Sequence, residues 1–132
     1  MRLPPLSDEE VRGEIERGEA LIRRVTGQDP RPLFRFPYGD RDARTLAAVN
    51  RGRYASIRWT FDTLGWMGRA RGESVDSIVG RVVGRLEPGA IIVMHVGANP
   101  ADRSTLDADA LPRLIAEIRA QGYEIVTIRE FL

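Results

Sequence analysis

The sequence lacks cysteine and lysine and contains a single histidine, and each shortage excludes a kind of chemistry. Without cysteine the chain can form no disulfide, thiolate nucleophile or cysteine-ligated metal site. All 20 basic residues are arginine, which excludes a Walker lysine and a Schiff-base lysine. A zinc site needs about three protein ligands, so one histidine cannot form the centre of such a site alone.

The chain also has no long apolar run and no excess of charge of one sign. Residues 1–6 are followed by charged residues, so they predict neither a signal peptide nor a membrane span. A net charge of +1 gives no electrostatic reason to expect binding to nucleic acid or to an anionic membrane. We expect one domain over residues 1–132, cytoplasmic as written, or exported to the cell envelope if the chain is a fragment of a longer precursor.

Helical and strand patterns alternate along the chain. A capping box at Ser7 and Glu10 predicts the first helix, which Gly27 ends. Further helices are expected from Asp40 or Asp42 to Gly52, from Ser74 to Leu86, and over 107–122. Apolar runs predict strands at 33–36, 54–61, 90–95 and 124–128. The crossovers between these runs are long enough for parallel connections, so the fold class is α/β with parallel strands and outer helices.

Three of these apolar runs end in polar or aromatic residues of types that often bind ligands or take part in catalysis. Arg35 and Tyr38 follow the first run, Asp62 and Trp66 follow the second, and His95 ends the third. Since the carboxyl ends of parallel strands lie at one edge of a sheet, we expect these residues to form one pocket.

Each of these residue types suits a specific task. The backbone amide of Tyr38, just after the turn at Pro37, could donate to an oxyanion. A tryptophan such as Trp66 can stack on a sugar ring, and an imidazole can protonate a leaving amine as a general acid. The alternatives are a surface arginine at position 35, a tryptophan that caps the core and a structural histidine.

In type and order, these segments resemble the third, fourth and fifth motifs of the polysaccharide deacetylases, the NodB-homology or carbohydrate esterase family 4 enzymes. The resemblance implies the C-terminal part of a distorted (β/α) barrel. In the family the arginine orients a catalytic aspartate and the tyrosine amide helps to bind the oxyanion, roles that fall on Arg35 and Tyr38. The family's fifth motif ends in the histidine that acts as a general acid, which corresponds to His95.

Two departures from the family pattern bear on activity. The first two family motifs, an Asp-Asp pair and His-x-x-x-His, supply the general base and the ligands of a divalent metal, zinc in the complete enzymes. This sequence contains neither motif. The fourth motif, Asp-x-x-Asp-Trp, reads Asp62-Thr63-Leu64-Gly65-Trp66 here, so Gly65 replaces the second aspartate. The resemblance assigns orientation of the histidine to that aspartate, and Asp62 could assume this role only if the loop bends differently.

The complete family hydrolyses N- or O-acetyl groups on polysaccharides or oligosaccharides with a metal-activated water. We expect this chain to hold no metal cofactor and to be inactive alone. The alternative is a non-catalytic carbohydrate-binding or assembly module that retains a groove with Trp66 and Tyr38. Asp102, Asp107 and Asp109 lack ligand spacing with His95, and the last two are expected to cap the fourth helix. A partial barrel exposes strand edges, so we also expect a homodimer, in which the N-terminal helices could be exchanged.

Overall fold

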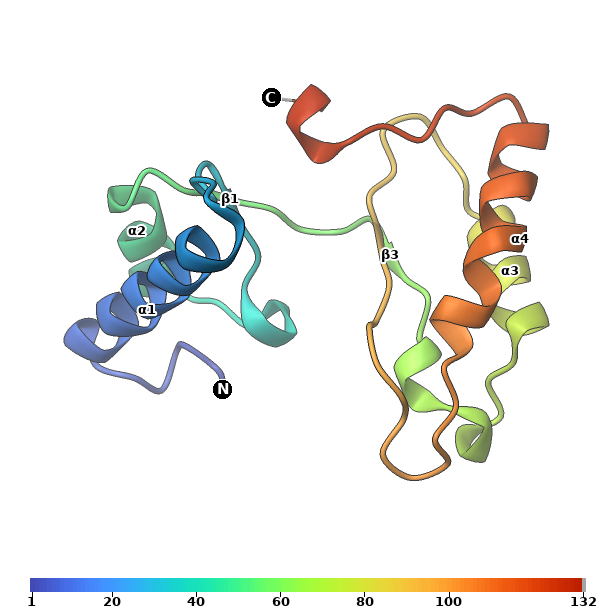
Figure 1. The fold of residues 1–132 in the computed structure, drawn as a ribbon, viewed down its shortest axis with the longest axis horizontal. Coiled ribbons are helices and arrows are strands. Elements are labelled where there is room, and N and C mark those ends of the chain that lie inside the picture. Colours follow the sequence, from blue (N-terminus) through green and yellow to red (C-terminus); the bar gives the residue numbers. More distant parts are fainter. Residues whose placement is uncertain (132) are drawn as a thin grey trace. The chain divides into compact units, whose positions relative to one another are not determined.

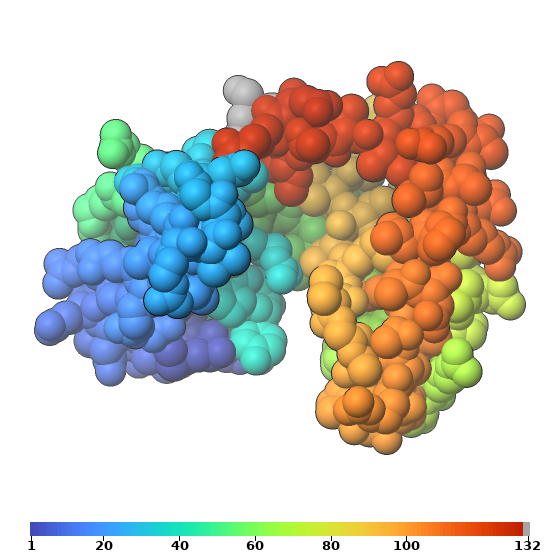
Figure 2. All heavy atoms as spheres, viewed as in Figure 1, coloured from blue at the N-terminus to red at the C-terminus, as the bar shows by residue number. Residues whose placement is uncertain are grey.

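The computed structural model describes residues 1–131, which form two compact units, Met1–Arg58 (unit 1) and the part that begins at Trp59 (unit 2). Each unit combines two α-helices with a two-stranded parallel sheet (Figure 1). Figure 2 shows the heavy atoms of the chain in the same view. The predicted α/β class with parallel strands is therefore confirmed, and over residues 1–131 the strands close no barrel. Across this same range, no helix has both the length and the apolar character needed to cross a membrane.

The first helix of unit 1 is α1 (Asp8–Thr26). Both hydrogen bonds of the predicted capping box form at its start, and Gly27 ends it in the left-handed conformation. β1 (Leu33–Phe34) and the 3-10 turn η1 (Pro37–Gly39) follow. Asp42 caps α2 (Ala43–Arg51), and the chain then enters β2 (Ala55–Ser56), which pairs with β1.

A small core holds unit 1 together. The buried side chains of this core are Leu3, Val11, Phe36, Val49 and Tyr54. The Tyr54 hydroxyl donates to Glu19 on α1 at 3.0 Å, and burial, aided by this contact, raises the pKa of Tyr54 to about 12. The apolar residues in the second half of α1, Ile22 and Val25 among them, are exposed, so only the first half of the helix contributes apolar side chains to the core.

Unit 2 contains β3 (Phe61–Asp62), the 3-10 turns η2 (Gly65–Met67) and η3 (Arg69–Arg71), α3 (Val75–Val83), β4 (Ile92–Val93), α4 (Leu106–Ala120) and the 3-10 turn η4 (Ile128–Phe131). β3 and β4 pair in parallel, and α3 and α4 pack side by side (Figure 1). The buried residues of this core are Phe61, Ile78, Val79, Val82, Leu106, Ala110, Leu114 and Ile118.

The predicted strands were too long, and one of them is wrong. The run 54–61 is divided into β2 and β3, which belong to different sheets. Residues 124–127 form no strand, and η4 begins at Ile128. An apolar run becomes a strand only where a neighbour satisfies its backbone groups, and over residues 1–131 each sheet has only two strands.

Candidate functional site

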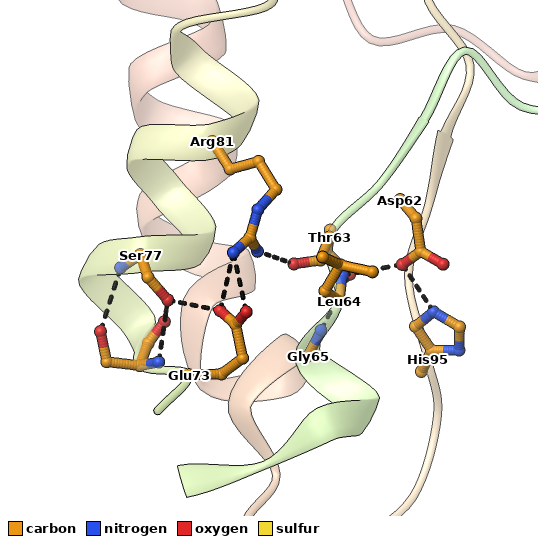
Figure 3. A network of polar contacts seen from close by, with 9 residues as sticks. Asp62, Thr63, Leu64, Gly65, Glu73, Ser77, Arg81 and His95 are labelled. Carbon is orange, nitrogen blue, oxygen red and sulfur yellow. Dashed lines mark hydrogen bonds and ion pairs between the residues drawn. The ribbon is translucent and has the colours of Figure 1, made fainter. Parts of the chain in front are cut away.

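Asp62 and His95 meet at the carboxyl end of the sheet in unit 2. β3 ends at Asp62 and β4 ends at Val93, which is paired with Asp62, so His95 follows at the same edge. Asp62 Oδ1 lies 2.9 Å from His95 Nε2 (Figure 3). An ionised carboxylate only accepts hydrogen bonds, so Nε2 is the donor in this contact.

The loop after β3 bends sharply enough for Asp62 to make this contact. Leu64 has a φ of 62°, in the left-handed region, and its backbone N–H donates to Asp62 Oδ1 at 2.7 Å. Thr63, between them, is fully buried. Asp62 thus contacts the His95 ring although Gly65 offers no side chain, and its role in orienting His95 stays a prediction.

Trp66 forms a half-exposed wall beside His95. Its side chain is 48% exposed, and its ring centroid lies 6.4 Å from that of His95, with the planes inclined at 61°. The Trp66 carbonyl accepts a hydrogen bond from the Asn99 side chain at 2.7 Å. A pocket of about 100 Å³ opens here, lined among others by Gly65, Trp66, His95, Asn99 and Asp107.

The loop after β4 is bound to the turns after β3, at one end of unit 2 (Figure 1). Asp102 accepts hydrogen bonds from the Ala70 backbone at 2.7 Å and from the Ser104 hydroxyl at 2.6 Å. The Ser104 hydroxyl and then the Ala70 amide lower the pKa of Asp102 to about 2. Gly68 has a φ of 75°, and a Cβ there would lie 2.6 Å from Asp102 Oδ2, so position 68 requires glycine.

A polar network from α3 supports the same loop (Figure 3). The Arg81 guanidinium donates to the Thr63 carbonyl and to both oxygens of Glu73, at 2.8 and 2.9 Å. The Ser77 hydroxyl also donates to Glu73, at 2.6 Å. Burial alone would raise the pKa of Glu73, but the hydrogen bonds from Ser77 and Arg81 outweigh it and lower the pKa. The sequence analysis missed this network, whose only local signal was Glu73 directly before the Ser74 cap.

Asp107 contradicts the expectation that it caps α4. Thr105 is the N-cap residue, and Asp107 lies in the first turn of the helix with only 4% of its surface exposed. Its Oδ2 accepts the backbone N–H of His95 at 2.7 Å. Asp109, also inside the helix, accepts from the Thr105 hydroxyl at 3.0 Å, so neither aspartate caps a backbone amide of α4 as predicted.

Arg35 and Tyr38 belong to unit 1. Tyr38 lies in η1 with a φ of 60°, and its side chain is 71% exposed. The Arg2 guanidinium lies 5.4 Å from the centroid of the Tyr38 ring. A left-handed conformation at a non-glycine residue costs roughly 1–3 kcal/mol and is concentrated at functional positions. The structure thus brings Asp62, Trp66 and His95 together, while their meeting with Arg35 and Tyr38 in one pocket stays a prediction.

The donor set does not fit a zinc ion. Over residues 1–131, no three histidine, aspartate or glutamate side chains are close enough together to hold a metal. Asp62 and His95 supply two donors, and these are bonded to each other. Zinc needs about three protein ligands, so any zinc would have to be held with residues that this chain does not supply.

Comparisons with known proteins relate this arrangement to one family. Residues 1–57 match the family model "Polysaccharide deacetylase". A chitooligosaccharide deacetylase of Bradyrhizobium sp. is 33% identical over 124 residues, which cover 88% of this chain and 55% of that protein. A solved peptidoglycan N-acetylglucosamine deacetylase superposes with a TM-score of 0.85 at 27% identity, over 98% of this chain and 57% of that one. A pseudoenzyme of carbohydrate esterase family 4 from Bacillus anthracis superposes with a TM-score of 0.82 at 28% identity, over 98% of this chain and 41% of that one.

The parallel strands with their helices are of the NodB-homology type. In sequence and in fold the chain is similar to the polysaccharide deacetylases. It spans about half the length of the curated relatives it matches.

Proposed function

We propose that this chain is the substrate-facing, C-terminal part of a carbohydrate deacetylase that acts on acetylated amino sugars. The observation that carries the proposal is the 2.9 Å contact between Asp62 and His95, beside a half-exposed tryptophan, in a chain similar to this family. Two matched relatives are named for chitooligosaccharides and for peptidoglycan N-acetylglucosamine, which suggests N-acetylglucosamine polymers as the substrate class.

In this proposal His95 is the general acid. The Asp62 carboxylate accepts from Nε2 and orients the ring. When the ring is protonated, Nδ1 carries the second proton, which passes to the leaving amine and leaves the neutral ring with Nε2–H. Such a proton transfer contributes about 10²–10⁴-fold to a rate.

Trp66 would form one wall of the sugar site, because its large apolar face can cover a pyranose ring. In unit 1, Tyr38 would offer its backbone amide to the oxyanion of the tetrahedral intermediate, and Arg35 would orient the catalytic aspartate of the complete enzyme. The strained φ of Tyr38 supports a functional role for that turn.

We infer that the isolated chain releases no measurable acetate. The general base and the metal ligands belong to motifs absent from its sequence. The remaining oxyanion and acid contributions are worth roughly 10²–10⁴-fold each, too little to make amide hydrolysis visible in an ordinary assay. The predicted cytoplasmic location stays a prediction, and a cell-wall substrate would favour the exported alternative.

Two assays with a chito-oligosaccharide test the proposal. In a Trp59→Phe background Trp66 is the only tryptophan, and we expect acetylated oligomers to change its fluorescence, whereas Trp66→Phe removes binding. Acetate release should stay at the blank. Release that follows the chain through purification and is lost in His95→Ala would overturn the inferred inactivity, and absence of any binding would overturn the substrate-facing role.

A non-catalytic binding or assembly module is the second candidate. One matched structure is itself described as a pseudoenzyme of the same family, which supports this alternative. Unit 2 also carries an apolar groove of about 430 Å³, lined by β4, α4 and residues 123–128. We propose that a second copy covers this groove, because identical copies offer the same unpaired surface to each other in a two-fold dimer.

A further inference from the structure

Gly65 is a glycine for reasons of space, not of backbone conformation. It is buried at the start of η2, and its φ lies outside the left-handed region that favours glycine. A Cβ at this position would lie 2.4 Å from Asp107 Oδ1, 2.5 Å from Cγ and 2.7 Å from Oδ2. The Asp107 carboxylate therefore occupies the volume into which a side chain at position 65 would extend.

The two oxygens of that carboxylate have different surroundings. Oδ2 accepts the backbone N–H of His95 at 2.7 Å. Oδ1 is buried and has no hydrogen-bond partner within the described part of the chain. A buried, half-satisfied carboxylate costs free energy, so its presence calls for a compensating role. Its place in the first turn of α4 provides part of the compensation, because the helix dipole favours negative charge there.

We propose that Asp107 is a positioning residue for His95, and that it supplies from α4 the carboxylate that this site cannot carry at position 65. The volume can be filled from position 65 or from position 107, but not from both. By accepting the His95 backbone N–H, Asp107 fixes the backbone position from which the imidazole contacts Asp62. This inference goes beyond the proposed deacetylase function, and none of its tests depends on activity.

A thermodynamic cycle in urea tests the shared volume. Gly65→Ala adds only a Cβ, and we expect it to lower the folding constant roughly ten- to a hundredfold, as overpacking does. In an Asp107→Ala background all three clashing atoms are gone, so Gly65→Ala should be neutral or stabilising. An equal cost in both backgrounds would overturn the shared volume.

The single histidine gives a second, spectroscopic readout. We expect Asp107→Ala to shift the His95 backbone amide in ¹⁵N NMR spectra and to weaken the preference for the Nε2–H tautomer. Asp109→Ala, an exposed aspartate one half-turn further along α4, is the matched control and should leave His95 unchanged. Asp107→Asn keeps both the shape and an acceptor oxygen, and should retain most of the wild-type His95 signals.

Unchanged His95 signals in Asp107→Ala would refute the positioning role. If Asp107→Ala does not fold, Asp107→Asn decides the matter. The clash with Gly65→Ala must then persist at its full size, and the His95 amide must remain close to its wild-type shift. Loss of either property in Asp107→Asn would equally refute the proposal.

Discussion

Replacement of Arg81 by methionine should destabilise unit 2 far more than the loss of an ordinary surface ion pair. The Arg81 side chain is 20% exposed and its partner Glu73 only 10%. Arg81→Met leaves Glu73 without its cation and the Thr63 carbonyl without its side-chain donor. Removing one partner of a buried pair costs about 3–5 kcal/mol, and an exposed pair is worth about 0–1 kcal/mol. For this partly buried pair we expect a loss of about 2–3 kcal/mol near neutral pH.

The cost of Arg81→Met should also depend on pH with a defined sign. The pKa of Glu73 is lowered in the folded chain, so the carboxylate stabilises the fold at pH values above its ordinary pKa of 4.5. This stabilisation is lost as the pH falls through the lowered, folded-state value. The difference between wild type and Arg81→Met should therefore shrink below about pH 4.

Urea titration followed by tryptophan fluorescence measures this effect, because both tryptophans lie in unit 2. Arg113→Met is the matched control: Arg113 and Asp76 form an ion pair at 2.5 Å whose side chains are 52% and 84% exposed. We expect this control to cost less than about 1 kcal/mol. Equal losses in the two variants, or a loss in Arg81→Met that is the same at pH 7 and well below pH 4, would refute the reasoning.

Three further predictions concern the loops, the metal and the assembly. Asp102→Asn should lower the thermal midpoint at pH 7, and much less near pH 2. The Asp102 carboxylate has a pKa of about 2 in the folded chain, so its stabilisation is complete above its ordinary pKa of 3.8 and is lost as the pH falls through 2. Equal losses at both pH values would contradict this. Calorimetry should detect no tight one-to-one zinc binding, and binding that His95→Ala abolishes would prove the expectation wrong. Light scattering at micromolar concentration should give twice the 14.8 kDa chain mass, and Ile125→Arg, beside the apolar groove, should reduce it. A folded wild-type species at 14.8 kDa would refute the dimer.

Local signals predicted the helices well. Ser7, Asp42 and Ser74 each accept a backbone N–H three residues on, as caps do. Ser7 and Ser74 start their helices where the sequence indicates, and Asp42 is one of the two starts that it left open for α2. These signals depend on neighbours in the sequence, so no tertiary information is needed to identify them. The start of α4 was the exception, because the buried environment of Asp107 prevails over the capping preference of aspartate.

Strand limits and the supports of the site depend on distant residues. The run 54–61 looks like one strand, but its residues pair with β1 at one end and β4 at the other. The Asp62–His95 contact could be anticipated from the shared sheet edge, whereas the contact of Asp107 with Gly65 could not. No pattern in one sequence indicates which buried carboxylate fills the space beside a glycine.

The central claim is that Asp62, Trp66 and His95 form a site for an acetylated sugar. NMR titration of the wild-type chain with N-acetylglucosamine oligomers, observing the single histidine, tests it most directly. We predict that the His95 ring signals shift with the acetylated oligomer, shift much less with the glucosamine oligomer of the same length, and do not respond in Trp66→Ala. His95 signals that remain unchanged at saturating acetylated oligomer would contradict the account.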